Sequence, residues 1–185
     1  MKKILRIDSS LFGAASVSKQ LADELVIQLV KHHSQHSITH RDLTAPQIPH
    51  LDDQLLTALN TPAEQLTTEQ QQRVSFADQL IDELSQADTL IIGAPMYNFA
   101  VPSVLKSWFD HVARAGVTFR YGENGPEGLL QIEHLKVDQP AHDDVDNHHK
   151  EHDVQNQVQQ SIKYLEKDQF LLHLGWYRKC KMVDN

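Results

Sequence analysis

This sequence has only one cysteine, lacks long apolar runs and has fewer basic than acidic residues. The single cysteine, Cys180, excludes an intrachain disulfide and a thiolate metal cluster, and it suits a reducing compartment. No apolar run approaches the roughly 20 residues that span a bilayer. The formal net charge of -8 disfavours a nucleic-acid or anionic-membrane surface. We therefore expect a soluble protein that binds a small molecule, with no nucleic acid and no membrane as partner.

The start of the chain is basic, as the start of a secretory leader is. Lys2 and Lys3 precede a short apolar stretch, but Arg6 and Asp8 interrupt that stretch within a few residues. We therefore expect no export, and the cytoplasm is the expected location.

Two glycine-rich nucleotide motifs are missing from the loop at residues 9–18, which follows the first expected strand. This loop contains no G-x-G-x-x-G, which holds a dinucleotide pyrophosphate, and no G-x-x-x-x-G-K-[ST], which holds a nucleoside triphosphate. The absence of both motifs disfavours NAD as a tightly held cofactor, and it disfavours ATP.

Strand-like and helix-like segments alternate along the first 112 residues. The expected strands are residues 4–7, 37–43 and 88–95, and the expected helices begin near Lys19, Thr67 and Pro102. Residues 88–95 are almost continuously apolar, which is typical of a parallel strand with helices on both faces of the sheet. With 185 residues the chain suits one domain. The alternation predicts an α/β fold with right-handed βαβ units and an open parallel sheet.

Two further segments are expected to lie outside this alternation. Pro46 and Pro49 cannot continue a sheet interior, so a long connection is expected there. Residues 116–128 combine a strand-like piece with a turn at Gly125-Pro126, which predicts a flap or hairpin.

The first loop is rich in hydroxyl side chains. Ser10, Ser16 and Ser18 stand beside the start of a helix, where free backbone N–H groups and the positive end of the helix dipole favour an anion. A phosphate suits this loop. Capping of the helix by Ser16 or Ser18 is a simpler explanation, and the two readings are compatible.

The loop at residues 94–102 places a thioether, two aromatic rings and a carboxamide at the mouth of the sheet. These side chains belong to Met96, Tyr97, Asn98 and Phe99. Such a mixture suits a flat heteroaromatic ring with donors and acceptors on its edge, as in a flavin. The alternative is that Met96 and Phe99 are core residues and that Asn98 only supplies turn geometry.

Taken together, these segments resemble a known family. The similarity rests on Ser10, Ser16-Val17-Ser18, residues 94–99, Pro102-Leu105-Lys106-Trp108-Asp110 and residues 116–121. Their spacing is similar to that of the FMN-dependent NADH:azoreductase and NADH:quinone oxidoreductase family over about residues 2–131. The resemblance implies a flavodoxin-like fold with helices on both faces of the sheet. It assigns FMN binding to Ser10, Ser16, Val17, Ser18, Met96, Tyr97, Asn98 and Phe99.

The resemblance also implies a reaction. NADH passes a hydride to FMN and leaves, and a quinone or an aromatic azo compound then receives the electrons in a ping-pong cycle. No side-chain nucleophile is needed, so no catalytic residue is assigned. Two alternatives stay open: a flavin-binding electron carrier without a defined substrate, and a degenerate, inactive family member.

The resemblance implies a quaternary structure as well. Family members are homodimers whose active sites lie at the subunit interface. We therefore expect a homodimer in which Trp108 and its helix face the partner, with Phe99, Phe119 and Tyr121 lining the substrate slot.

Beyond Gln131 the sequence loses the family's pattern. Family members continue with a fourth strand and a glycine-rich turn, whereas residues 132–138 are at best a weak strand and no glycine occurs between Gly128 and Gly175. We therefore divide the chain into an FMN-binding domain, residues 1–131, and an atypical polar C-terminal segment, residues 132–185. This segment is interpreted as disordered or as frameshifted relative to the family, and either change disrupts the last strands of the sheet.

Histidine is the remaining candidate for chemistry. His142, His148, His149 and His152 stand among aspartates, but such tracts are usually solvated polar sequence, and we assign no metal site. His111 is expected to be a surface or interface residue rather than a proton donor.

Overall fold

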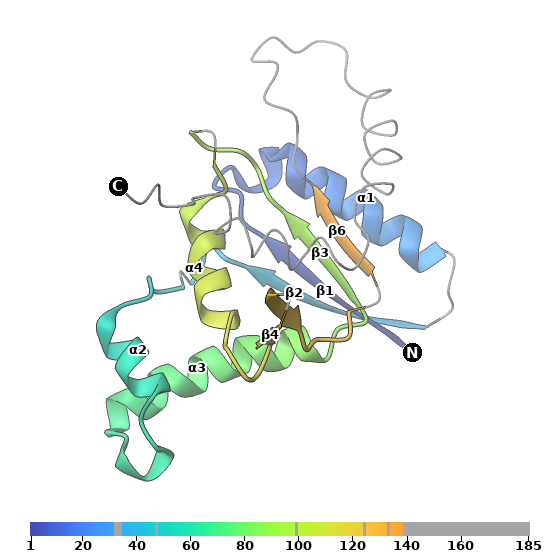
Figure 1. The fold of residues 1–185 in the computed structure, drawn as a ribbon. Coiled ribbons are helices and arrows are strands. Elements are labelled where there is room, and N and C mark those ends of the chain that lie inside the picture. Colours follow the sequence, from blue (N-terminus) through green and yellow to red (C-terminus); the bar gives the residue numbers. More distant parts are fainter. Residues whose placement is uncertain (32–34, 47, 99, 124, 133, 139–185) are drawn as a thin grey trace, which may run out of the picture.

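The central sheet has four parallel strands. The computed structural model describes residues 1–138 except 32–34, 47, 99, 124 and 133. The strands β1 (Lys2–Asp8), β2 (His36–Asp42), β3 (Thr89–Gly93) and β6 (His134–Asp138) lie in the order β2-β1-β3-β6 (Figure 1). The strand order reverses between β1 and β3, because the chain passes from β1 to β2 on one side and then returns to place β3 on the other side of β1. The expected α/β fold with an open parallel sheet is confirmed.

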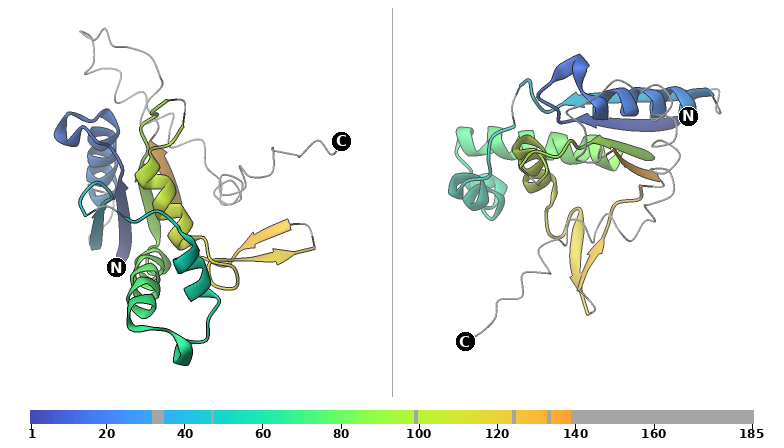
Figure 2. Two further views of the ribbon diagram at one scale, coloured as in Figure 1. Left: turned by 90° about the vertical axis from the view of Figure 1, so that its left-hand side faces the viewer. Right: turned by 90° about the horizontal axis from the view of Figure 1, so that it is seen from above.

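One face of the sheet is covered by α1 (Val17–Lys31), which lies on the opposite side from α3 and α4 (Figure 2). Leu21 and Leu25 of α1 pack with Ile4 and Ile91 of the sheet. These leucines are four residues apart and therefore lie on one side of the helix. The helix begins two residues earlier than expected near Lys19.

The other face carries the larger core. It is covered by α3 (Thr68–Ser85) and α4 (Ser103–Val112), whose apolar side chains meet those of β1 and β3. The main contributors are Leu5, Ile7, Leu80, Leu84, Leu90, Ile92, Leu105 and Trp108. α3 begins with a capping box in which Thr67 and Gln70 exchange hydrogen bonds between side chain and backbone.

Two expectations for α4 are wrong. Trp108 is 0% exposed and belongs to the core between α4 and the sheet, so it does not face a partner. His111 is 3% exposed, so it is not a surface residue of this chain. Both side chains lie on the buried side of α4 because they are three residues apart, which is close to one helical turn.

The long connection after β2 contains a helix that the sequence did not predict. α2 (Asp53–Leu59) has seven residues, and the Asp52 side chain caps it by accepting a hydrogen bond from the N–H of Leu55 at 2.9 Å. Short 3₁₀ turns occur at Gly13–Ala15 (η1) and Ala63–Gln65 (η2). α2 packs against α3 through Leu55 and Ala58, which are buried.

The expected hairpin is confirmed. β4 (Phe119–Gly122) and β5 (Gly125–Gly128) pair antiparallel and project away from the body of the molecule (Figure 2). The base of the hairpin is tied to the end of α4 by Thr118, whose hydroxyl donates to the carbonyl of Val112 at 2.7 Å. Tyr121, near the tip, is 78% exposed.

The sheet continues past residue 131. β6 pairs parallel with β3 along its whole length, from Thr89 opposite His134 to Gly93 opposite Asp138. Residues 139–185 lie outside the described residues, and with them lie the histidine tract and most of the expected C-terminal segment. In the described part, no helix is both long and apolar enough to cross a membrane.

Candidate functional site

The carboxyl ends of β1 and β3 bring the two expected ligand loops together. Because parallel neighbours end at the same edge of a sheet, the loops after Asp8 and Gly93 leave it side by side. Ser9, 1% exposed, donates its hydroxyl hydrogen to the carbonyl of Gly93 at 2.6 Å. Ser9 therefore holds the two loops together, while the next residue, Ser10, is placed nearer the surface.

A tyrosine joins the serine loop to the aromatic loop. The phenolic oxygen of Tyr97 accepts a hydrogen bond from the N–H of Leu11 at 3.0 Å and lies 3.2 Å from Oγ of Ser10. Ser10 Oγ also accepts from the N–H of Phe12 at 3.3 Å. The two segments are thus joined into one surface although they are more than 80 residues apart in the sequence.

The start of α1 presents unpaired N–H groups. Ser16 caps the helix, accepting from the N–H of Lys19 at 3.3 Å, and its hydroxyl lies 2.9 Å from that of Ser18. No described residue accepts a hydrogen bond from the N–H of Val17 or Ser18. Both readings of the sequence are therefore compatible here, because Ser16 caps the helix and an anion site remains beside it.

The aromatic loop has the geometry of a tight turn. Tyr97 and Ala100 exchange backbone hydrogen bonds at 2.9 and 3.0 Å, and Asn98 between them has φ of 50°. Asparagine is among the few residues that adopt this left-handed conformation readily. The turn leaves Asn98 exposed and Met96 partly buried at the edge of the sheet. Phe99 lies outside the described residues.

Apolar side chains surround this turn without being buried. Leu11 is 63% exposed, Phe12 69% and Val101 42%. The Phe12 ring lies edge-on to the Tyr97 ring, with centroids 6.0 Å apart. An exposed apolar rim next to free helix N–H groups fits a ligand with an aromatic ring system and a phosphate. The ring can pack against the apolar side chains, and the phosphate can accept hydrogen bonds from the N–H groups.

A charged network beneath the serine loop was missed by the sequence analysis. The Asp8 carboxylate, 4% exposed, accepts from Nε of Arg6 at 3.0 Å and lies 2.8 Å from Nε2 of His40. Lys19 Nζ is 3.8 Å away, and Arg6 also pairs with Asp23. Burial lowers the pKa of Arg6, but the hydrogen bonds to both aspartates outweigh it and raise that pKa above its usual value.

The network was missed because its members are distant in the sequence. Arg6 and His40 are partners in the register of β1 and β2, and therefore lie on the same face of the sheet. Only knowledge of that register would have brought them together.

The fold and the site define a class of flavodoxin-like α/β proteins, and comparison with known proteins agrees. The model of a family described as having a flavodoxin-like fold matches residues 2–167, so the chain belongs to that family. The match includes β6 and extends beyond the described residues.

Individual relatives share up to about half of their aligned residues with this chain. An FMN-dependent NADH:quinone oxidoreductase of Marinomonas sp. is 52% identical over 130 residues, covering 70% of this chain and 66% of the relative. One of Cellvibrio japonicus is 48% identical, covering 70% and 65%. The crystal structure of an FMN-dependent NADH-azoreductase from Bacillus anthracis in complex with FMN is similar, with a TM-score of 0.65 and 27% identity, over 75% of this chain and 68% of that one.

The match covers slightly less than two thirds of the two curated relatives' own length. The match to the flavodoxin-like family, residues 2–167, includes both ligand loops.

Proposed function

We propose that this protein binds FMN at the carboxyl edge of β1 and β3. The phosphate is assigned to Ser10, Ser16, Val17 and Ser18, and the isoalloxazine to Met96, Tyr97, Asn98 and Phe99. The observation that carries this proposal is the joining of the two loops by Tyr97, which places the unpaired N–H groups of α1 and the apolar rim on one surface. Family membership and the names of the relatives support it.

We further propose that the protein is an FMN-dependent oxidoreductase that passes electrons from NADH to quinones and aromatic azo compounds. Bound FMN supplies hydride chemistry, which no amino-acid side chain provides. The chain itself would orient the cofactor through the serine loop, and it would exclude water from the ring through Leu11, Phe12 and Val101. No side chain is assigned a catalytic role. The support is that relatives about half identical to this chain are named FMN-dependent NADH:quinone oxidoreductases.

A comparison of FMN with riboflavin tests the cofactor site. The two differ only in the phosphate, so quenching of flavin fluorescence by the full chain should show tighter binding of FMN. Ser16→Ala should reduce the preference for FMN and leave riboflavin affinity nearly unchanged, because the hydroxyl lies beside the free N–H groups and far from the ring. Ser85→Ala, which removes a surface hydroxyl bonded to the carbonyl of Asp82, is the matched control. Equal binding of both flavins by the unmodified protein would contradict the phosphate site.

Steady-state kinetics separate the enzyme from the two alternatives. An oxidoreductase oxidises NADH rapidly only when a quinone or azo dye is present, with the parallel double-reciprocal lines of a ping-pong cycle. A flavin-binding electron carrier binds FMN but oxidises NADH slowly under all these conditions. A degenerate family member binds no flavin.

We propose a homodimer and a cytoplasmic location as well. The hairpin of β4 and β5 projects from the body (Figure 2). Its Tyr121 is exposed, and so are Val117 and Leu129, which flank the two strands in the sequence. Exposed apolar side chains on a projecting element are suited to contact with a second copy. Light scattering during size-exclusion chromatography should give twice the mass of one chain, which is 21.1 kDa.

A further inference from the structure

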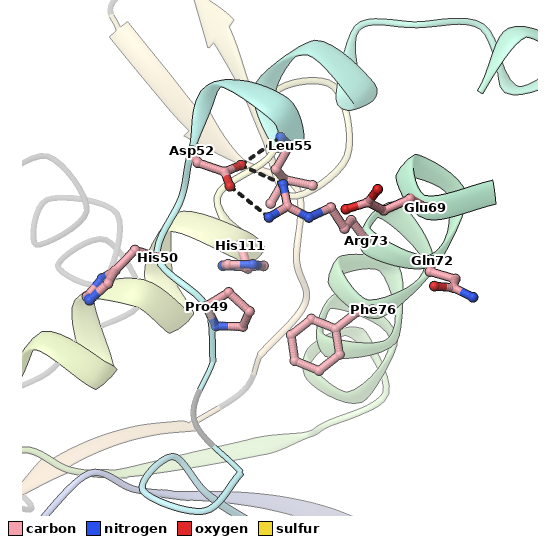
Figure 3. A pocket seen from close by; sticks show the side chains of 9 residues that line it. All are labelled: Pro49, His50, Asp52, Leu55, Glu69, Gln72, Arg73, Phe76 and His111. Carbon is pink, nitrogen blue, oxygen red and sulfur yellow. Dashed lines mark hydrogen bonds and ion pairs between the residues drawn. The ribbon is translucent and has the colours of Figure 1, made fainter. Parts of the chain in front are cut away.

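A cavity of about 260 Å³ lies between α2, α3 and α4, apart from the candidate flavin site. Pro49, Leu55 and Phe76 form its apolar walls, while Asp52, Arg73 and His111 supply its polar groups (Figure 3). Nothing in the proposed flavin function uses these residues. The cavity is large enough for a single-ring compound and combines apolar walls with a few polar groups, as ligand sites do.

The hydrogen bond of His111 determines which of its two ring nitrogens carries the proton. Nδ1 lies 2.9 Å from the carbonyl oxygen of Ser107, and a carbonyl only accepts, so Nδ1 carries the proton. In the neutral ring, Nε2 is then an acceptor. No described residue forms a hydrogen bond with Nε2, although the side chain is 3% exposed and lines the cavity. Where Nε2 meets the cavity it is open to a donor, so a ligand that supplies one replaces a hydrogen bond to water there.

The charges around the cavity disfavour an anionic ligand. Both terminal nitrogens of Arg73 donate to the Asp52 carboxylate, each at 2.7 Å. Among the described residues that line the cavity, Arg73 is the only lysine or arginine, and its charge is therefore neutralised. Glu69 adds a negative charge at the wall. A neutral ligand is favoured over a carboxylate or a phosphate.

The walls favour an aromatic ring. Phe76 and His111 are arranged edge to face, with centroids 5.9 Å apart and planes at 82°. Pro49 and Leu55 complete the apolar surface around them. His111 is held in place by its bond to Ser107, whose hydroxyl lies 2.9 Å from Nδ1 of His50. The acceptor is therefore oriented before any ligand arrives, which lowers the cost of binding.

We propose that this cavity binds neutral single-ring phenols, whose hydroxyl donates to Nε2 of His111 while the ring packs against Phe76 and Pro49. The site is distinct from the candidate flavin site and does not depend on it.

The test is a titration of the full-length protein, labelled with ¹⁵N-histidine, at pH 8, with and without FMN. Phenol is the probe, and anisole, which has the same ring without a donor, is its counterpart. We expect the chemical shift of His111 Nε2 to change when phenol is added and to remain the same when anisole is added. Phenol should bind about fivefold more tightly than anisole, because one hydrogen bond contributes about that ratio. Excess FMN should not displace phenol.

His111→Phe removes the acceptor and keeps an aromatic ring against Phe76. We expect this variant to bind phenol and anisole equally. Lys106→Ala, five residues earlier on the exposed side of α4, should keep the preference of the unmodified protein. Equal affinity for phenol and anisole in the unmodified protein, or a shift confined to other histidines, would overturn the proposal. That result does not depend on whether the His111→Phe variant folds.

Discussion

Tyr97 is the residue that links the two parts of the candidate flavin site. Tyr97→Phe keeps the ring and its edge contact with Phe12 but removes the oxygen that bonds to Leu11 and Ser10. We expect the FMN dissociation constant to rise about 3- to 10-fold, the effect of about 1 kcal/mol of hydrogen bonding, through faster release of the flavin. Stopped-flow recovery of flavin fluorescence measures it.

A surface hydroxyl provides the control for this substitution. Thr61→Val removes an exposed hydroxyl that donates to the carbonyl of Thr57 at 2.8 Å, two residues beyond the end of α2. Its FMN release rate should equal that of the unmodified protein. An unchanged release rate in Tyr97→Phe would mean that the two loops are held together by Ser9 alone.

Asp8 is the second residue whose substitution we expect to have a measurable effect, in this case on the free energy of unfolding. It is 4% exposed and pairs with Arg6, which is 7% exposed. Asp8→Asn leaves the buried guanidinium with Asp23 as its only charged partner among the described residues, so we expect the free energy of unfolding to fall by about 3 kcal/mol. Urea denaturation measures the change. Asp110→Asn, which breaks the exposed pair with Lys106, should cost about 0.5 kcal/mol or less.

At the scale of elements, α2 depends on an ionised cap. Hydrogen bonds from Arg73 are the main reason that the pKa of Asp52 falls to about 2, and the N–H of Leu55 adds to the effect. A carboxyl whose folded pKa lies below its unfolded pKa stabilises the fold above the unfolded value, and it loses that contribution as pH falls through the folded value. The contribution of Asp52 is therefore complete above about pH 4 and lost between about pH 4 and pH 2.

Asp52→Asn tests this dependence. The amide can still cap α2, but it has no titratable proton, so thermal stability should fall less steeply than in the unmodified protein between pH 4 and pH 2. Asp53→Asn is the matched control, because it removes a neighbouring carboxylate that forms no ion pair among the described residues, and it should keep the native slope. Identical slopes for all three proteins would mean that the Arg73 pair does not persist in solution.

The elements that the sequence predicted are those with a long or strongly apolar pattern. α3 has eighteen residues and repeats its apolar positions through Leu80 and Leu84, and β3, with the sequence TLIIG, has an apolar centre. α2, with seven residues, is too short to show a helical period, and its stability comes from packing on α3. β6, with the sequence HLKVD, alternates polar and apolar residues over only five positions, which is weak evidence for a strand.

The candidate site was predictable in its parts and not in its connections. Serines before a helix and aromatic residues after a buried strand can be recognised along the chain. The bond between Ser10 and Tyr97, and the approach of His50 to Ser107, join residues far apart in sequence, and only the folded sheet and helices determine them. The cavity at His111 was missed for the same reason, since its walls come from three separate helices and a loop.

At the scale of the whole molecule, β6 is the element on which the proposed division of the chain depends. We placed the FMN-binding domain at residues 1–131, and both ligand loops lie within it. The strand at residues 134–138 nevertheless pairs with β3, the most buried strand of the sheet. A chain that ends at residue 131 would leave one side of β3 without its backbone partners, which destabilises a sheet and invites association of its edges.

Two truncated chains separate the contribution of β6 from that of the C-terminal segment. A chain ending at residue 138 keeps the strand, and one ending at residue 131 lacks it. Because a lost strand of five residues removes several hydrogen bonds, each worth about 1 kcal/mol, and about 4 °C accompanies each kcal/mol, we expect the shorter chain to melt more than about 5 °C lower. Differential scanning calorimetry measures this difference, and flavin fluorescence shows whether FMN is retained. Equal melting temperatures and equal FMN affinity would place the domain boundary at residue 131, whereas failure of both chains to fold would mean that residues beyond 138 complete the sheet.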